Sequence, residues 1–364
     1  MYRIPLSATP FDAPGISGIL DSYSEKPATK LIEDFEAALR AYTGARYVLA
    51  VNSGTSAIHL GLMALGVGSG DVVIAPSFTY VATVAPILYQ GATPILVDSE
   101  LTTWNMNPEL LETAIKSQIQ LKKKPKCAII VHNYGMPAQM SAINAICDRY
   151  EIPILEDAAE ALGSQYLGKP AGTLGKIGIF SFNNNKIVTG YGGGALLTES
   201  EEIYQKSLFW STQSREQKPY YEHRELGYNY RISPLSSASG LLGLKQIEAK
   251  IEERRAIFDS YRNSLHADKI SGWLKEQNES LSNRWLSTFL LSNSLKTSDI
   301  VDKTSRLGIE CRRLWNPMHL QPFYHKFPAF VSGAGEQLFK EGLSLPSSNL
   351  ALVSEVTKVL NQTS

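Results

Sequence analysis

The feature of this sequence that most limits its fold is a regular alternation of short apolar runs with longer helical or polar stretches. Residues 31–43 place Leu31, Phe35 and Leu39 on one helical face, and Gly44 stands where that helix should end. Strand-like runs occupy residues 47–51, 72–75, 94–97, 128–131, 153–155, 177–182 and 195–198, and helical or loop stretches separate them, notably 56–65, 108–119 and 140–150. This alternation predicts an α/β fold in which helices cover both faces of a mostly parallel sheet.

The pattern changes near residue 240. A long amphipathic segment, residues 243–265, carries Leu244, Ile247 and Ile251 at helical spacing. We expect this segment to connect a large domain, residues 1–240, to a smaller C-terminal α/β domain, residues 241–364, which the length of the chain allows.

Charge and cysteine content exclude several classes of protein. Lys+Arg and Asp+Glu number 35 each, so the basic surface typical of nucleic-acid binding is not expected. Cys127, Cys147 and Cys311 have neither metal-ligand spacing nor a disulfide pattern, so we expect no metal site and a reducing compartment. The start of the chain lacks a signal peptide, and no apolar run is long enough to span a bilayer. A cytoplasmic protein without membrane or nucleic-acid partners is the expectation.

A first candidate binding motif, Asn-Ser-Gly-Thr-Ser, follows the first strand and begins a helix. Gly54 would let the backbone approach an anion, and Thr55 and Ser56 offer hydroxyl groups at a helix N-terminus, where a phosphate is stabilised. The alternative is a simple helix N-cap. Neither a Gly-Lys-Ser/Thr ending nor a GxGxxG motif accompanies the first strand, which disfavours a nucleoside triphosphatase and a nicotinamide-dependent dehydrogenase.

A carboxylate and a lysine follow two later strands. Asp157 stands at the end of an apolar run, where ligands bind in open α/β sheets, and could keep a pyridinium nitrogen protonated; a cap for a following helix is the alternative. Alternation along that strand makes the preceding Glu156 the less inward of the two acids. Lys186 lies between apolar residues just after a strand and before a glycine-rich stretch, residues 190–194. Desolvation favours the neutral amine that Schiff-base chemistry requires, whereas an exposed lysine is the ordinary alternative.

With these pieces in order, the sequence resembles the sugar aminotransferases among the fold-type I pyridoxal-phosphate enzymes. The resemblance covers almost the whole chain. It rests on six motifs in the family's order, N-S-G-T-S-A, P-S-F-T-Y-V-A-T, E-D-A-A-E-A, S-F-N-N-N-K, G-Y-N-Y-R and P-M-H-L-Q-P-F-Y.

The resemblance implies a role for each matching residue. Lys186 would hold pyridoxal 5′-phosphate as a Schiff base, and Asp157 would pair with the pyridine nitrogen. The remaining implied contacts are the phosphate for Gly54, Thr55, Ser56 and Ser181, the cofactor ring for Tyr80, the ring oxygen for Glu160, the phosphate of a neighbouring subunit for Asn229, and the substrate pocket for Trp315 and His319. Asn229 therefore implies a homodimer with shared active sites. Core packing is the alternative for Tyr80, and an ordinary packed position for Trp315 and His319.

Two positions depart from the family pattern. Glu160 stands where many relatives have Gln or His, and residues 21–30 lack the Ser-Thr-Gly-Pro pattern of the loop that shapes the substrate pocket. These two departures bear on which substrate the protein binds more than on the reaction that it catalyses.

The reaction implied is transfer of an amino group from L-glutamate, leaving 2-oxoglutarate, by way of pyridoxamine 5′-phosphate to a nucleotide-linked keto-sugar. The residues near 186 and 313–319 look most like relatives that aminate C4 of a 4-keto-6-deoxyhexose, with C3 amination as the alternative. A sugar dehydratase would have His in place of Lys186. A non-catalytic protein that binds the cofactor or a nucleotide-sugar would not need the lysine. The nucleotide, the stereochemistry of the sugar and the pathway stay open.

Overall fold

The computed structural model describes residues 2–7, 11–292 and 295–362. Its central feature is an eight-stranded sheet in the order β1-β9-β8-β5-β4-β2-β3-β14. β9 is antiparallel to β1 and β8, and the remaining neighbours are parallel. The strands are β1 (Tyr47–Val51), β2 (Val72–Pro76), β3 (Thr93–Val97), β4 (Cys127–Val131), β5 (Ile154–Asp157), β8 (Ile177–Ser181), β9 (Gly194–Thr198) and β14 (Ala329–Phe330). The predicted α/β fold with a mostly parallel sheet is confirmed.

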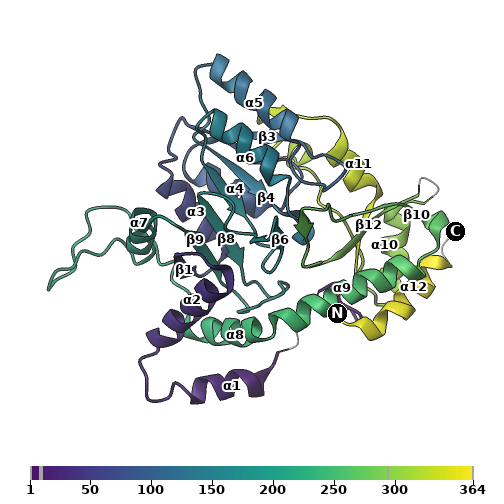
Figure 1. The fold of residues 1–364 in the computed structure, drawn as a ribbon, viewed down its shortest axis with the longest axis horizontal. Helices are drawn as coiled ribbons and strands as arrows, with labels where there is room; N and C mark the ends of the chain where they lie inside the picture. The colour runs from purple at the N-terminus through teal and green to yellow at the C-terminus, as the bar shows by residue number, and fades with distance from the viewer. Residues whose placement is uncertain (1, 8–10, 293–294, 363–364) are drawn as a thin grey trace.

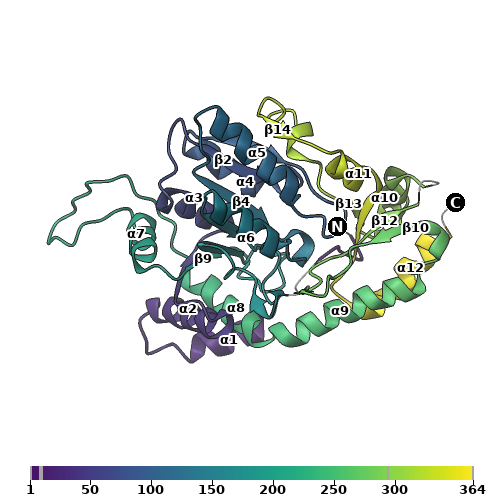
Figure 2. The same ribbon diagram turned by 45° about the horizontal axis from the view of Figure 1, so that its top comes forward.

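Helices cover both faces of this sheet (Figures 1 and 2). Alternate residues of each strand contribute to separate apolar clusters, as Val48 and Leu49 of β1 illustrate, because successive side chains point to opposite faces. One face packs against α2 (Thr29–Thr43), α5 (Pro108–Gln120), α6 (Met140–Arg149) and α8 (Pro234–Lys245), and the other against α3 (Gly54–Ala64), α4 (Val81–Tyr89) and α7 (Glu201–Ser211). α1 (Ala13–Asp21) lies beside α8.

A second sheet lies in the C-terminal part of the chain, in the order β10-β12-β15-β13. The strands of this sheet are β10 (Ile270–Trp273), β12 (Ser287–Leu291), β13 (Arg312–Arg313) and β15 (Gly342–Leu345). The helices of the same part of the chain are α9 (Ile247–Ser264), α10 (Thr297–Arg306), α11 (Ala334–Glu341) and α12 (Val353–Asn361). A small third sheet joins β11 (Ser280–Leu281), β6 (Gln165–Tyr166) and β7 (Lys169–Pro170). Short 3₁₀ turns lie at Asn133–Gly135, Ala267–Lys269, Met318–Leu320 and Leu350–Leu352.

The segment expected to connect two domains is two helices rather than one. α8 ends at Lys245 and α9 begins at Ile247, with Gln246 between them outside the ideal helical geometry. α8 starts at Pro234, well before the predicted segment. Its small residues let it pack closely on α2: a Cβ on Gly240 would lie 2.6 Å from the ring of Phe35. The boundary at residue 240 stays a prediction. It falls within α8, and β14, from beyond that boundary, completes the large sheet.

The middle of the 212–233 segment between α7 and α8 extends from the body as a long arm (Figures 1 and 2), and the end of the segment, at Tyr230 and Ile232, is hydrogen-bonded to β1 and its flanking Asn52. Tyr221 and Leu226 on this arm are 77% and 75% exposed. Within the described ranges, no helix has the length and apolar character needed to cross a membrane.

Candidate active site

A cavity of about 450 Å³ lies at the carboxyl ends of β1, β5 and β8, beside the start of α3. Open parallel sheets bind ligands at this edge, because loops and helix N-termini converge there. Residues from distant parts of the sequence meet in it. Of the predicted site residues it contains Gly54, Thr55, Tyr80, Asp157, Glu160, Ser181, Lys186 and Trp315.

Three predicted residues lie outside this cavity. Ser56 is buried in the first turn of α3, where its Oγ donates to Asn52 Oδ1 at 2.6 Å. Asn229 is exposed at the base of the long arm, where its backbone O accepts a hydrogen bond from Asn52 Nδ2 at 3.2 Å. His319 Nδ1 lies 2.6 Å from Ser77 Oγ, and its Nε2 lies 3.3 Å from Glu336. The roles of these three residues, like those of the eight that line the cavity, stay predictions.

The start of α3 forms one wall of the cavity. Ser53 is the N-cap, and its Oγ accepts a hydrogen bond from the backbone N–H of Ser56 at 3.0 Å. Gly54 faces β8 so closely that a Cβ would lie 3.2 Å from Ser181 Cβ, and a Cβ on Gly194 would lie 2.5 Å from Gly54 N. The glycines let the helix start and two strands meet around an opening that suits an anion.

Asp157 ends β5 and is 4% exposed. Its Oδ2 accepts a hydrogen bond from Thr83 Oγ1 at 2.8 Å, and its Oδ1 accepts one from Ala159 N at 3.2 Å. Burial raises the pKa of this carboxyl, against the lowering effect of these hydrogen bonds. No helix begins in residues 158–164, so the helix-cap alternative for Asp157 is wrong.

Glu156 points to the opposite face of the sheet, as alternation along a strand requires. It does not line the cavity, yet it is fully buried. Its Oε1 lies 2.7 Å from His132 Nε2, and its Oε2 accepts from Leu174 N at 2.7 Å. The hydrogen-bond partners of Glu156 therefore lie outside the cavity.

Lys186 projects into the cavity from the loop after β8. Its side chain is 13% exposed, and Nζ lies 3.3 Å from Glu160 Oε1 and 4.1 Å from the centre of the Trp285 ring. The exposed-lysine alternative is wrong. Glu160 is held from its other side, because Oε2 accepts from Tyr134 N at 2.8 Å, and burial raises the pKa of this carboxyl.

Trp285 is a site residue that sequence reasoning missed. Its indole N–H donates to Asn185 O at 2.8 Å, and its backbone N–H donates to Asn283 Oδ1 at 2.9 Å. The Asn283 amide also donates to Glu160 O at 2.9 Å, so one side chain holds both the tryptophan and the glutamate that surround the Lys186 amine. Only the folded chain brings these residues together.

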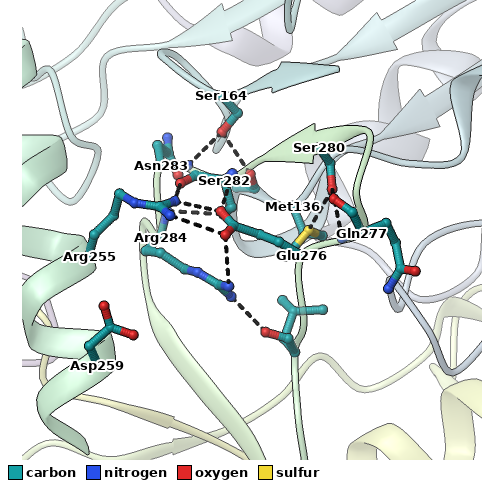
Figure 3. A network of polar contacts seen from close by, with 12 residues as sticks. Met136, Ser164, Arg255, Asp259, Glu276, Gln277, Ser280, Ser282, Asn283 and Arg284 are labelled. Atoms are coloured by element: carbon teal, nitrogen blue, oxygen red, sulfur yellow. Dashed lines mark hydrogen bonds and ion pairs between the residues drawn. The ribbon is translucent and has the colours of Figure 1, made fainter. Parts of the chain in front are cut away.

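A polar network supports Asn283 (Figure 3). The backbone N–H of Asn283 donates to Ser164 Oγ at 2.9 Å, and Ser164 Oγ donates to Gly135 O at 2.7 Å. Beside it, Glu276 accepts two hydrogen bonds from Arg255, at 2.5 and 3.1 Å. The network connects the loop before β12 to the loop after β4 and supports Asn283, which contacts the backbone of Glu160 and Trp285.

Tyr80, Trp285 and Trp315 form the aromatic part of the cavity wall, and Tyr134 packs against both tryptophans. Tyr134 is nearly parallel to Trp285 and Trp315, with centroids 6.4 and 5.6 Å away. Tyr134 adopts a left-handed backbone conformation, φ 55°, which is uncommon for a residue with a side chain. Tyr80 packs 5.5 Å from Trp315 and is 55% exposed, so core packing does not account for it.

The comparisons with known proteins agree with this geometry. Residues 18–363 match the model of the DegT/DnrJ/EryC1/StrS aminotransferase family. The chain is 42% identical over 341 residues to EpsN of Bacillus subtilis, whose name assigns it to the pyridoxal phosphate-dependent aminotransferases; the match covers 92% of this chain and 87% of EpsN. The chain belongs to this family. It is therefore a pyridoxal phosphate-dependent sugar aminotransferase, as the resemblance implied.

Two further relatives support the assignment. The enzyme is 32% identical over 336 residues to GDP-perosamine synthase of Caulobacter vibrioides, covering 91% of this chain and 88% of that protein. A family aminotransferase of known crystal structure from Brucella abortus shares the fold with a TM-score of 0.87 at 27% identity, covering 95% and 94% of the two chains.

The residues present fit pyridoxal 5′-phosphate. Lys186 offers the amine, and Asp157 offers a buried carboxylate for a cationic ring nitrogen. Gly54 keeps open the anion cradle at α3, which a Cβ would narrow. The described residues contain no group of three or more His, Cys, Asp or Glu that could hold a metal ion.

The buried carboxyl of Asp157 should make the cofactor-free protein less stable as pH rises. Because the folded state raises the pKa of Asp157, its stabilising contribution is complete below the ordinary carboxyl range and is lost as pH increases through the raised pKa. Asp157→Asn retains an acceptor for Thr83 and removes this titration. Thermal unfolding between about pH 4 and pH 8 should therefore show a smaller loss of Tm for the variant than for the wild type.

The matched control is Asp148→Asn, at an exposed position, which should keep the wild-type pH dependence. Parallel pH profiles for the wild type and Asp157→Asn would contradict the account of this carboxyl.

Proposed function

We propose that the enzyme transfers an amino group from L-glutamate to C4 of a nucleotide-linked 4-keto-6-deoxyhexose, as a homodimer with shared active sites. The observation that carries the proposal is the largely shielded Lys186 amine in the same cavity as the buried Asp157 carboxyl. The relatives named GDP-perosamine synthase support a nucleotide-linked amino sugar as the product. The three cysteines are free and buried, which suits the reducing cytoplasm.

Asp157 would control the protonation of the ring nitrogen. When bound, pyridoxal 5′-phosphate supplies the carbonyl that receives the amino group and a ring that withdraws electrons. Thr83 and the backbone of Ala159 hold the Asp157 carboxylate at the end of β5. A cationic nitrogen opposite this carboxyl would favour its ionised form, offsetting the effect of burial. The carboxylate would then keep a proton on that nitrogen.

Lys186 would carry the proton that moves during the reaction. Its neutral amine would accept a proton from the α-carbon of the donor, and the resulting ammonium would donate that proton to the C4′ carbon of the bound cofactor. Glu160 Oε1 and the face of Trp285 stabilise the ammonium form and hold its position. The tryptophan and the glutamate, fixed by Asn283, keep the amine within reach of the reacting atoms.

The other walls would position the substrate and limit water. Gly54, Thr55 and Ser181 surround the anion cradle, where the N-terminus of α3 stabilises negative charge. Tyr80 and Trp315 form the aromatic side of the opening. Their flat faces suit a cofactor ring and a sugar better than a charged group.

A panel of nucleotide-linked keto-sugars tests the substrate. With pyridoxal phosphate and L-glutamate, the enzyme should aminate a 4-keto-6-deoxyhexose, with products identified by mass spectrometry. Lys186→Ala should lower turnover by more than about 10³-fold and abolish the yellow absorbance of the bound cofactor. Lys176→Ala, which changes an exposed lysine just before β8, should retain both properties.

Amination of 3-keto-sugars alone would contradict the C4 assignment and favour C3. Turnover from glutamate by Lys186→Ala would contradict the role of the lysine. If the wild type transferred no amino group to any member of the panel, the enzymatic proposal itself would be overturned.

The shared active site predicts complementation between two inactive variants. The side chain of Asn229 is exposed at the base of the arm and does not line the cavity of its own chain, and we assign it to the partner's site, as the family resemblance implies. A purified hybrid dimer of Lys186→Ala and Asn229→Ala chains should contain one intact site and recover about half of the wild-type activity.

The control hybrid pairs a wild-type chain with a chain carrying both substitutions. Sharing leaves this hybrid without an intact site, whereas sites built from one chain would leave it half active. Activity of the control hybrid combined with inactivity of the first hybrid would contradict the shared site.

A further inference from the structure

A second cavity of about 340 Å³ adjoins the active site. The two cavities share Asn185, Trp285, Arg312 and Trp315 in their walls, so they meet at these residues. The second cavity extends from there toward the N-terminal segment at Ser7 and toward the C-terminal sheet. Its volume is at the lower end of the roughly 300–1,000 Å³ typical of ligand sites, which suits a small group more than a nucleoside diphosphate.

Arg312 is held at the junction with one side of its guanidinium turned away from protein acceptors. Its Nε donates to Glu310 Oε1 at 2.7 Å, and Nη2 donates to the same oxygen. The other oxygen of Glu310 accepts from Leu6 N at 2.9 Å, which ties this pair to the N-terminal segment. In the described part of the chain, Arg312 Nη1 has no hydrogen-bond acceptor. The guanidinium is therefore oriented, yet retains two free donors.

A second donor lies close to Arg312 in the chain. The indole N–H of Trp315 is buried and has no hydrogen-bond partner within the described residues. A buried N–H without an acceptor is unfavourable, so a ligand that supplies an acceptor binds more tightly. Arg313, the neighbouring cation, is committed elsewhere, because it donates to Phe339 O at 3.2 Å and lies over the Phe339 ring.

A third cavity, of about 490 Å³, opens on the other side of Tyr80 and Trp315. Its walls include Met318, Phe323 and Tyr324 and contain no charged side chain. Such walls suit the flat, apolar faces of a nucleotide base. The two cavities beside the active site therefore differ in character: one has the cationic Arg312 in its wall, and the other has no charged side chain.

We propose that the second cavity binds the side-chain carboxylate of a dicarboxylic amino donor, through Arg312 Nη1 and the indole N–H of Trp315. The α-carboxylate is bonded to the reacting carbon and must stay in the cavity with Lys186. The side-chain carboxylate lies further along the donor chain and can enter the second cavity, which continues from Arg312. This inference rests on the proposed function, because it takes glutamate as the donor.

The test compares L-glutamate with L-glutamine, which has the same shape but no side-chain charge. The donor half-reaction is followed by the absorbance of the bound cofactor, and the keto-sugar half-reaction is measured separately. Arg312→Gln should reduce the preference for glutamate over glutamine by about 10- to 100-fold, as expected for a lost charged hydrogen bond. Arg313→Gln removes the same charge from the same cavity wall and should keep the preference.

A binding measurement gives a readout independent of turnover. Isothermal titration of the purified protein with glutarate, a dicarboxylate that cannot react, should give a Kd about tenfold or more higher for Arg312→Gln than for the wild type. The monocarboxylate butyrate should bind both proteins equally.

Several outcomes would overturn the inference. An unchanged glutamate preference in Arg312→Gln would remove the carboxylate site while leaving the aminotransferase proposal intact. An equal loss with both donors would place Arg312 at the α-carboxylate, and a loss confined to the keto-sugar half-reaction would place it at the nucleotide diphosphate. If the wild type transferred no amino group from glutamate at all, the proposed function would fail first.

Discussion

The structure of this active site depends on keeping one lysine amine away from bulk water, beside groups that accommodate both of its protonation states. The Lys186 amine lies between Glu160 and the face of Trp285, and Asp157 lines the same cavity. Two buried carboxyls in one cavity are unfavourable in isolation, and burial raises the pKa of both. In the proposed function, Glu160 pairs with the Lys186 amine and Asp157 pairs with the cationic ring of the cofactor. Functional chemistry here costs stability of the cofactor-free protein.

Hydrogen bonds from the surrounding structure hold the residues around the Lys186 amine in place. Asn283 joins the backbone of Glu160 to that of Trp285, and Ser164 anchors Asn283 in turn. The left-handed Tyr134 aims its N–H at Glu160. These contacts come from the large sheet, from the loop after β4 and from the segment before β12. The C-terminal part of the chain therefore contributes to the active site, because Trp285, Arg312 and Trp315 line the cavity.

The sequence predicted much of the fold and the chemical centre, because both follow from local patterns. Apolar runs located the central strands, and the strand ends located Asp157 and Lys186. The apolar periodicity did not identify elements that are very short or apolar on most sides. α4 is apolar and contains Pro86, β14 has two residues, and α8 is buried on most sides. Trp285 and Arg312 could not be found, because their relation to Lys186 exists only in three dimensions. Asn229 and His319 do not line the cavity of the single chain.

Reduction of the cofactor-loaded wild-type enzyme with borohydride, followed by peptide mass spectrometry, tests the central claim most directly. Reduction fixes an imine as a stable amine, and the account predicts one pyridoxyl group, on the peptide that contains Lys186. A pyridoxyl group on a different lysine, or none, would contradict it.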